Sequence, residues 1–349
     1  MPRPEIRGRV SGVGSGMRAG FTAWRIVGQC PGIPSRSFGT LLMGLSEHIQ
    51  KSLFPSLSSL DPGRLRDEVM RKGWEWLAEH PADLDRIRDN LRAFSLPSGE
   101  QDVRAVAEHV LLHYTEKLMP LCGSVGEYRR FVDESIAGDE LLKTVDLSRE
   151  NSRALLLASA HFGAVEMIVP FLSSRGVDVT PVLRFSTPEF SRIARGRAEE
   201  MAAHGDFRPI RFIEIGKPGT VAAMEMAAVL RRGNVLVSMF DERTGYSTPV
   251  DLAGRKVWGG AGLERLLHFA GASTTVATVF AVRREDGTCR LRCRVPKGEG
   301  TELLRQMYDN LEELVRGHFE QWYFLHEDIP FVEREGNGAG QQEKAEAAR

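Results

Sequence analysis

The segment HFGAVE places a histidine and a glutamate five residues apart, at His161 and Glu166. A carboxylate that holds an imidazole fixes its tautomer and stabilises its charged form, which suits a general base that takes a proton from a hydroxyl. Residues five apart on a helix are rotated by about 140° from each other, so we expect contact only if His161 lies on a turn and Glu166 on the following helix. Gly163 permits such a turn. The spacing alone fits a structural histidine at a strand–helix junction equally well.

Two further polar residues follow predicted strands, Arg184 after VDVTPVL and Asp241 after NVLVSMF. In parallel sheets, ligands gather at the carboxyl ends of the strands, where loops lead into helices. We therefore expect His161, Arg184 and Asp241 to converge on one site.

The elements that would position these residues begin near residue 150, where short apolar runs alternate with amphipathic helical patterns. The predicted strands are RALLLASA, VDVTPVLR, RPIRFIE, GNVLVSMF, STTVATVFAVRR and TCRLRCRVP. Helical patterns lie between them, including GTVAAMEMAAVLRRG, which Gly233 closes in a C-cap position. This alternation predicts an α/β fold with a mixed, mostly parallel sheet flanked by helices, in which the last two strands form a hairpin-like pair.

The chain divides into four predicted parts. Residues 1–43 are rich in Gly and Arg and are expected to form a disordered arm, unless translation begins at Met43. Residues 44–148 show helical periodicity, which predicts a helical region packed on the core. Residues 149–332 are expected to form the α/β core, and residues 333–349, with no apolar residue larger than Ala, a disordered tail.

The composition argues against a nucleic-acid-binding protein, a disulfide-rich protein and a cysteine metal site. The 46 Lys and Arg residues against 47 Asp and Glu give a net charge of -1, which argues against a nucleic-acid partner. The four cysteines are too few and too scattered for a disulfide framework, and Cys289 and Cys293 lack a second pair that would complete a metal site. We therefore expect a reducing compartment, no metal and no bound cofactor.

The stretch from Ala154 to Leu172 approaches the hydropathy of a membrane span. Two titratable residues lie near its middle, however, and a charge at the bilayer centre costs ~2.5–3.5 kcal/mol. We expect a buried strand, a turn and a buried helix instead. Rival enzyme classes lack their motifs, since the chain has no G-x-S-x-G elbow, no P-loop and no zinc-protease helix.

The residues HFGAVE, after an apolar strand, resemble the H-x4-D/E motif of the lysophospholipid acyltransferase-like superfamily. In particular, they are similar to the lauroyl/myristoyl acyltransferases of lipid A biosynthesis. Five further segments resemble landmarks of that family and fall in the same order within roughly residues 84–332: RIRDNLRAF, VLRFSTPEF, MFDERTG, VDLAGRKVWGGAGLERLLHFAGA and EQWYFLH. The common order makes the resemblance more specific than any single motif.

The resemblance implies an acyltransferase that moves a fatty acyl group from an acyl carrier protein or coenzyme A thioester to a hydroxyl of a lipid or glycolipid. By position, His161 would be the base and Glu166 its partner. The residues that would bind substrate or order the loops around it are Arg184, Gly163, Asp241 and Arg243. Arg184 would lie near the acyl donor or an anionic group of the substrate, with an ordinary strand-end salt bridge as the alternative. Residues that would brace the active-site strand are Glu320, Gln321 and His326. Arg243 departs from the family pattern, which tends to show a second acidic residue there.

Two other functions stay open. The protein could acylate a small molecule or a sugar in a specialised pathway, or hydrolyse a thioester. It could also be a non-catalytic relative that binds lipid or a carrier protein. For the leading function, the resemblance implies a cytoplasmic protein that lies peripherally on the inner face of the cell membrane.

Overall fold

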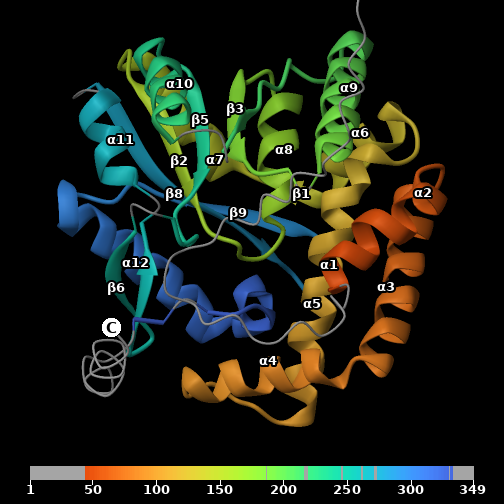
Figure 1. The fold of residues 1–349 in the computed structure, drawn as a ribbon. Coiled ribbons are helices and arrows are strands. Elements are labelled where there is room, and N and C mark those ends of the chain that lie inside the picture. Colours follow the sequence, from red (N-terminus) through yellow and green to blue (C-terminus); the bar gives the residue numbers. More distant parts are fainter. Residues whose placement is uncertain are drawn as a thin grey trace, which may run out of the picture. The chain divides into compact units, whose positions relative to one another are not determined.

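A computed structural model describes residues 44–185, 187–215, 219–244, 247–260, 262–270, 273–329 and 331–332, all within the compact unit Met43–Arg349. The arm and the tail expected at 1–43 and 333–349 lie outside the described residues. Helices dominate the described chain before residue 150, and strands alternate with helices after it (Figure 1).

The segment before residue 150 is mainly helical, as its periodicity predicts. Its elements are α1 (Leu45–Glu47), the π-helical turn η1 (His48–Leu53), α2 (Phe54–Leu57), α3 (Pro62–Glu79), α4 (Pro81–Ala93), α5 (Glu100–Leu118), the 3-10 turn η2 (Met119–Leu121), α6 (Val125–Ser135) and α7 (Asp139–Glu150). Side-chain caps set the starts of two of them. Asp61 accepts a hydrogen bond from the Arg64 N–H ahead of α3, and a capping box of Ser124 and Glu127 begins α6.

The core is a sheet of seven strands in the order β1-β9-β8-β2-β5-β3-β4. The strands are β1 (Ile136–Ala137), β2 (Ala154–Ser159), β3 (Val179–Leu183), β4 (Ile213–Glu214), β5 (Val235–Met239), β8 (Thr274–Arg283) and β9 (Cys289–Arg294). Neighbouring strands are parallel except β8 and β9, which are antiparallel. The protein is therefore α/β, with a mixed, mostly parallel sheet flanked by helices, as the sequence predicts (Figure 1).

Helices and short turns lie between these strands or follow the last of them. They are η3 (Val165–Met167), α8 (Ile168–Ser174), α9 (Pro188–His204), α10 (Gly219–Arg231), α11 (Leu263–Ala270), α12 (Gly300–Gly317), η4 (Phe319–Gln321) and η5 (Tyr323–His326). Gly233, just beyond α10, has a φ of 76°, the left-handed conformation that ends helices. Its position in the sequence predicts this role.

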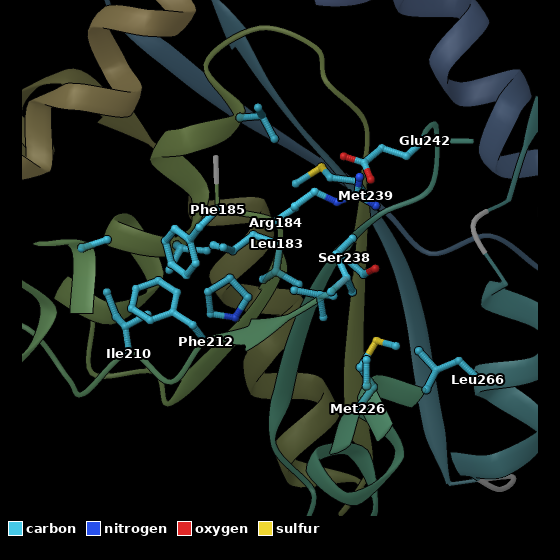
Figure 2. Close-up of a pocket in the computed structure, with 18 of the residues that line it drawn as sticks. Leu183, Arg184, Phe185, Ile210, Phe212, Met226, Ser238, Met239, Glu242 and Leu266 are labelled. Carbon is cyan, nitrogen blue, oxygen red and sulfur yellow. The ribbon is translucent and has the colours of Figure 1, made fainter. Parts of the chain in front are cut away.

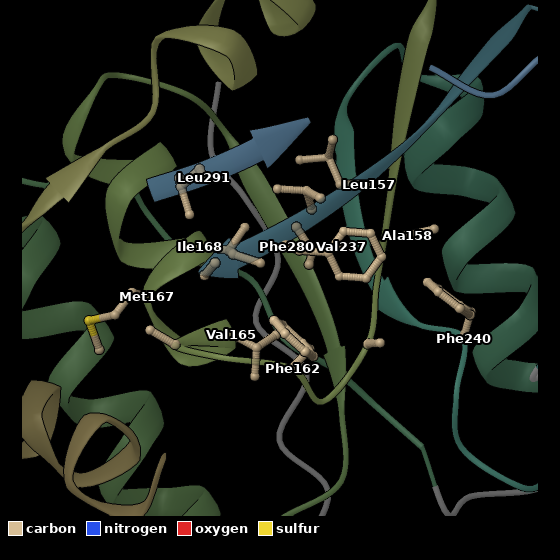
Figure 3. Close-up of a cluster of buried hydrophobic side chains, with 14 of the residues drawn as sticks. Leu157, Ala158, Phe162, Val165, Met167, Ile168, Val237, Phe240, Phe280 and Leu291 are labelled. Carbon is tan, nitrogen blue, oxygen red and sulfur yellow. The ribbon is translucent and has the colours of Figure 1, made fainter. Parts of the chain in front are cut away.

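Burial on both faces explains the continuous apolar runs of the middle strands. All six residues of β2 are buried. At the end of the sheet, the Phe280 ring packs edge to face against Phe162 and Phe240, with ring centroids 6.4 and 6.3 Å apart (Figure 3). Because Phe162 follows His161 directly, this packing fixes the turn that carries His161.

The apolar stretch from Ala154 to Leu172 consists of β2, a turn, η3 and the first part of α8. This is the strand, turn and helix expected for it. In the part of the chain that the structure describes, no helix combines the length and the apolar character needed to cross a bilayer.

A two-stranded antiparallel hairpin, β6 (Thr248–Leu252) and β7 (Arg255–Gly259), is not predicted by the sequence. Ala253 and Gly254 form its turn, with positive φ values of 47° and 78°. The Ala253 N–H donates to the Glu312 carboxylate at 2.8 Å, which ties the hairpin to α12.

The helical region is joined to the C-terminal segment through Asn90 on α4. Its amide Nδ2 donates to the carbonyl oxygens of Leu325 and Glu327, at 3.0 and 2.8 Å. Asn90 belongs to RIRDNLRAF and Leu325 to EQWYFLH, so two of the segments that carry the family resemblance are in contact.

Candidate active site

His161 lies two residues beyond the end of β2, and Asp241 lies two residues beyond the end of β5. These strands are parallel neighbours, and Ser159 pairs with Met239 at their ends. Residues at equal distances past a paired position of parallel strands emerge together at the carboxyl edge of the sheet. The register therefore brings His161 and Asp241 together, as expected from their positions after predicted strands.

Asp241 holds His161 through both carboxylate oxygens. Oδ2 accepts from the His161 backbone N–H at 2.8 Å, and Oδ1 lies 2.9 Å from the ring Nδ1. The Asp241 side chain is 3% exposed and that of His161 19%. A carboxylate at Nδ1 makes this nitrogen the hydrogen-bond donor and leaves Nε2 for other chemistry.

Residues near the end of the described chain contact the backbone carbonyl and the ring of His161. The Tyr323 N–H donates to the His161 carbonyl at 2.9 Å, and the Phe324 ring packs 5.0 Å from the imidazole, centroid to centroid. Gln321 braces the adjacent strand, because its side-chain amide exchanges two hydrogen bonds with the Arg283 backbone on β8. These contacts agree with the bracing role expected for Gln321.

Glu166 does not make the contact with His161 that the motif predicts. It lies on the 3-10 turn η3, and its Oε1 is 3.8 Å from Nε2 of His113 on α5. The hydrogen bond to His161 comes from Asp241 because the register of β2 and β5 already brings that carboxylate to Nδ1. Glu166 still lines the same cavity as His161, and its charge acts on the imidazole.

Burial lowers the pKa of His161, but the charge and hydrogen bond of Asp241 outweigh this effect. With smaller contributions from Glu242 and Glu166, they raise the pKa to about 9. The ring is therefore protonated at both nitrogens at neutral pH. A general base needs a free Nε2, so the reactive form gains population as the pH rises.

Glu242 lies on the side of the imidazole opposite Asp241. Its Oε1 is 3.4 Å from His161 Nε2, and its side chain is 34% exposed and lines the cavity. The carboxylate thus occupies the position where an incoming hydroxyl would meet Nε2.

Gly163 forms the turn that follows His161. Its φ is 62°, and its N–H donates to the Gln321 carbonyl at 2.8 Å. A Cβ at this position would lie 2.0 Å from the Ala281 carbonyl oxygen, so only glycine fits. Gly163 is not among the described residues that line the cavity, and its contact with substrate stays a prediction.

A cavity of about 1480 Å³ adjoins His161. It exceeds the roughly 300–1,000 Å³ of ordinary ligand pockets. Its walls come mainly from β3, α9, α10 and α11 and are mostly apolar. In the view of Figure 2, Phe185 and Phe212 lie on one side and Met226 and Leu266 on the other. Such walls suit a long apolar chain.

The cations that line the same cavity include Lys117 and Arg184. Neither forms a hydrogen bond or an ion pair with any residue that the structure describes. Arg184 therefore does not make the strand-end salt bridge that was its alternative role. Arg243 is exposed, with its guanidinium 6.0 Å from the Trp258 ring centre, and it is not among the described lining residues. Its expected contact with substrate stays a prediction.

Sequence reasoning missed Lys117, Glu242 and the proximity of His113 to Glu166. Burial, with nearby cations, holds the pKa of His113 well below its usual value, so this ring is neutral. Lys117 and His113 lie on α5. The local sequence does not predict that this helix faces the cavity. Glu242 could have been found, because it directly follows Asp241 at the edge of the sheet.

Across the described residues, no group of three His, Cys, Asp or Glu side chains is placed to hold a metal ion. Comparison of the chain with protein-family models and with curated proteins found no match.

Proposed function

We propose that the protein is an acyltransferase that moves a fatty acyl group from an acyl carrier protein or coenzyme A thioester to a hydroxyl of a lipid or glycolipid. His161 is the general base, and Asp241 positions it. The observation that carries this proposal is the place of the His161–Asp241 pair beside a large, mostly apolar cavity. The pair suits the activation of a hydroxyl, and the cavity suits an acyl chain.

In the proposed reaction, unprotonated Nε2 of His161 takes the proton of the acceptor hydroxyl while its oxygen attacks the thioester carbonyl. The C–S bond then breaks, an oxygen ester forms, and the proton passes from the imidazolium to the leaving thiolate. Asp241 stays ionised throughout and stabilises the imidazolium. Glu242 has to withdraw from Nε2 for the hydroxyl to approach, because its Oε1 lies 3.4 Å from that nitrogen.

Lys117 and Arg184 supply positive charge in the cavity that contains His161. A guanidinium binds phosphate in a forked geometry, and an ammonium binds it as a point charge. Both cations therefore favour an anionic group on the donor or the acceptor. The mostly apolar lining favours a lipid over a sugar or a small polar metabolite as acceptor.

The test offers the purified protein an acyl thioester with and without a lipid acceptor, and follows thiol release and acylated lipid by mass spectrometry. We expect acceptor-dependent transfer that slows by about 10²–10⁴-fold in His161→Ala. His204→Ala is the matched control, because that histidine is 54% exposed and is not among the residues that line the cavity.

Equal thiol release with and without acceptor would identify a thioester hydrolase instead. Lipid binding without any turnover, unaffected in His161→Ala, would identify a non-catalytic binding protein. Either result would overturn the proposal.

A further inference from the structure

Large apolar side chains are exposed on two helices beside the cavity. On α10, Val221 is 44% and Met224 69% exposed, and on α11, Phe269 is 59% exposed. The two helices contact each other (Figure 1). Met224 and Phe269 also line the cavity, so these exposed side chains lie at its mouth.

Exposed arginines lie on and next to the same two helices. Arg231 and its neighbour Arg232 are exposed at the end of α10, and Arg265 is exposed on α11. Neither Arg231 nor Arg232 forms an ion pair with a residue that the structure describes. Glu225 is an exposed acidic residue on α10.

Helical spacing places the apolar and cationic residues on common faces. Val221, Met224 and Arg231 are three and seven residues apart, which puts them on one side of α10. Arg265 and Phe269 are four residues apart and share a side of α11. We call these five residues, Val221, Met224, Arg231, Arg265 and Phe269, the α10–α11 rim.

We propose that the α10–α11 rim docks on a membrane surface that contains anionic lipids. Val221, Met224 and Phe269 insert among the lipids, and the arginines lie at the level of the anionic headgroups. The inference rests on the proposed function, because an apolar substrate gives this contact its purpose. A fatty chain that passed through water to reach the cavity would expose its apolar surface, whereas a mouth held at the bilayer avoids that exposure.

A membrane fits the rim better than a protein partner does. Met224 and Phe269 at the cavity mouth, and Val221 on the same side of α10 as Met224, can insert individually into a fluid bilayer. A protein partner would need a matching surface that also leaves the cavity mouth open. The arginines complement the negative surface potential of a membrane with anionic lipids.

The experiment measures binding of the full chain to vesicles of phosphatidylcholine, with and without phosphatidylglycerol, by co-sedimentation. We expect binding to the anionic vesicles that weakens as salt is added. The double change Met224→Gln and Phe269→Gln should reduce partitioning by at least about tenfold, because it removes the inserted apolar surface. Leu147→Gln is the matched control, since Leu147 is 57% exposed on α7 and is not among the residues that line the cavity.

A second variant tests the charge separately. Arg231→Gln with Arg232→Gln should lower binding to anionic vesicles and reduce its dependence on salt, with the thermal unfolding midpoint unchanged. Vesicle binding equal to wild type in both variants would overturn the proposal. Failure of the wild-type chain to bind either kind of vesicle would also overturn it, and rim-dependent capture of an acidic carrier protein would then name a protein as the partner.

His161→Ala separates this inference from the proposed function. Vesicle binding should persist in that variant while acyl transfer is lost. If wild-type protein binds vesicles through the rim but transfers no acyl group, the docking surface stands and the acyltransferase proposal fails.

Discussion

The Asp241 carboxylate accepts from the His161 backbone with one oxygen and contacts the His161 ring with the other. One side chain thus fixes both where the imidazole lies and which nitrogen it turns to the cavity. The two residues emerge at equal distances past the paired ends of β2 and β5, so the sheet itself sets their separation. Changes at Asp241 should therefore affect both the orientation and the pKa of His161.

Asp241→Asn removes the charge that raises the His161 pKa. We expect kcat to fall at least about tenfold, as for other residues that orient a reactive group. The pKa in the profile of kcat/KM against pH should move from about 9 toward 6.5. A purely structural role for Asp241 would lower the rate without moving the profile, so kinetics across pH distinguish the two.

Glu166→Gln tests the partner that the motif implies. Glu166 acts on His161 through its charge and forms no hydrogen bond with it among the described contacts. We expect a smaller loss of kcat than in Asp241→Asn, measured at the same pH. A larger loss in Glu166→Gln would mean that Glu166 replaces Asp241 as the partner during the reaction.

The pH dependence of activity follows from the raised pKa of His161. Below a pKa of about 9 most of the imidazole is protonated, and the fraction of free base grows about tenfold per pH unit. The value of kcat/KM should therefore rise from neutral pH and level off above about 9. Glu242→Gln should move the rise of kcat/KM to lower pH, because the Glu242 charge raises the pKa of His161. A profile that is flat between pH 6 and 9 would contradict the general-base role.

Stability should depend on pH through the same group. The folded protein binds the His161 proton more tightly than the unfolded chain, whose imidazole has the ordinary value of 6.5. This contribution is fully present below pH 6.5 and is lost as the pH rises toward about 9. Denaturant midpoints of wild type and His161→Gln should therefore differ more at the lower pH. If the midpoints of the two proteins differed equally below pH 6.5 and above about pH 9, the raised pKa of His161 would be ruled out.

Gly163→Ala should destabilise the protein, since its Cβ would lie 2.0 Å from the Ala281 carbonyl oxygen at a φ of 62°. We expect a loss of about 2–4 kcal/mol in the free energy of unfolding. Gly176→Ala is the control, with a φ of 78° but open space around the site, and should lose only about 1 kcal/mol. Equal losses in urea unfolding would show that the close approach to β8 costs nothing.

The strands of the sheet were predictable because burial on both faces demands continuous apolar residues, as in β2 and β5. Their carboxyl ends identified His161, Arg184 and Asp241. The contact between His161 and Asp241 was not predictable in the same way, because strand order depends on tertiary packing. Without that order, the nearer carboxylate at Glu166 is the natural partner to expect.

The hairpin of β6 and β7 shows a different limit. Two-residue hairpin turns are usually announced by Asn-Gly or Asp-Gly, whereas this one is formed by Ala253 and Gly254. Its strands are largely exposed and lack regular apolar alternation. The local residues therefore do not predict the hairpin. The hydrogen bond from Ala253 to Glu312 on α12 helps to stabilise it.

The hydrogen bonds from Tyr323 to the His161 carbonyl and from Asn90 to Leu325 and Glu327 have a consequence for biosynthesis. A ribosome releases the N-terminal helices and β2 long before η5. The turn that carries His161 therefore lacks its hydrogen bond from Tyr323 until the last described segment has left the exit tunnel. A nascent chain stalled after β9 would carry every proposed catalytic side chain and still lack a finished catalyst.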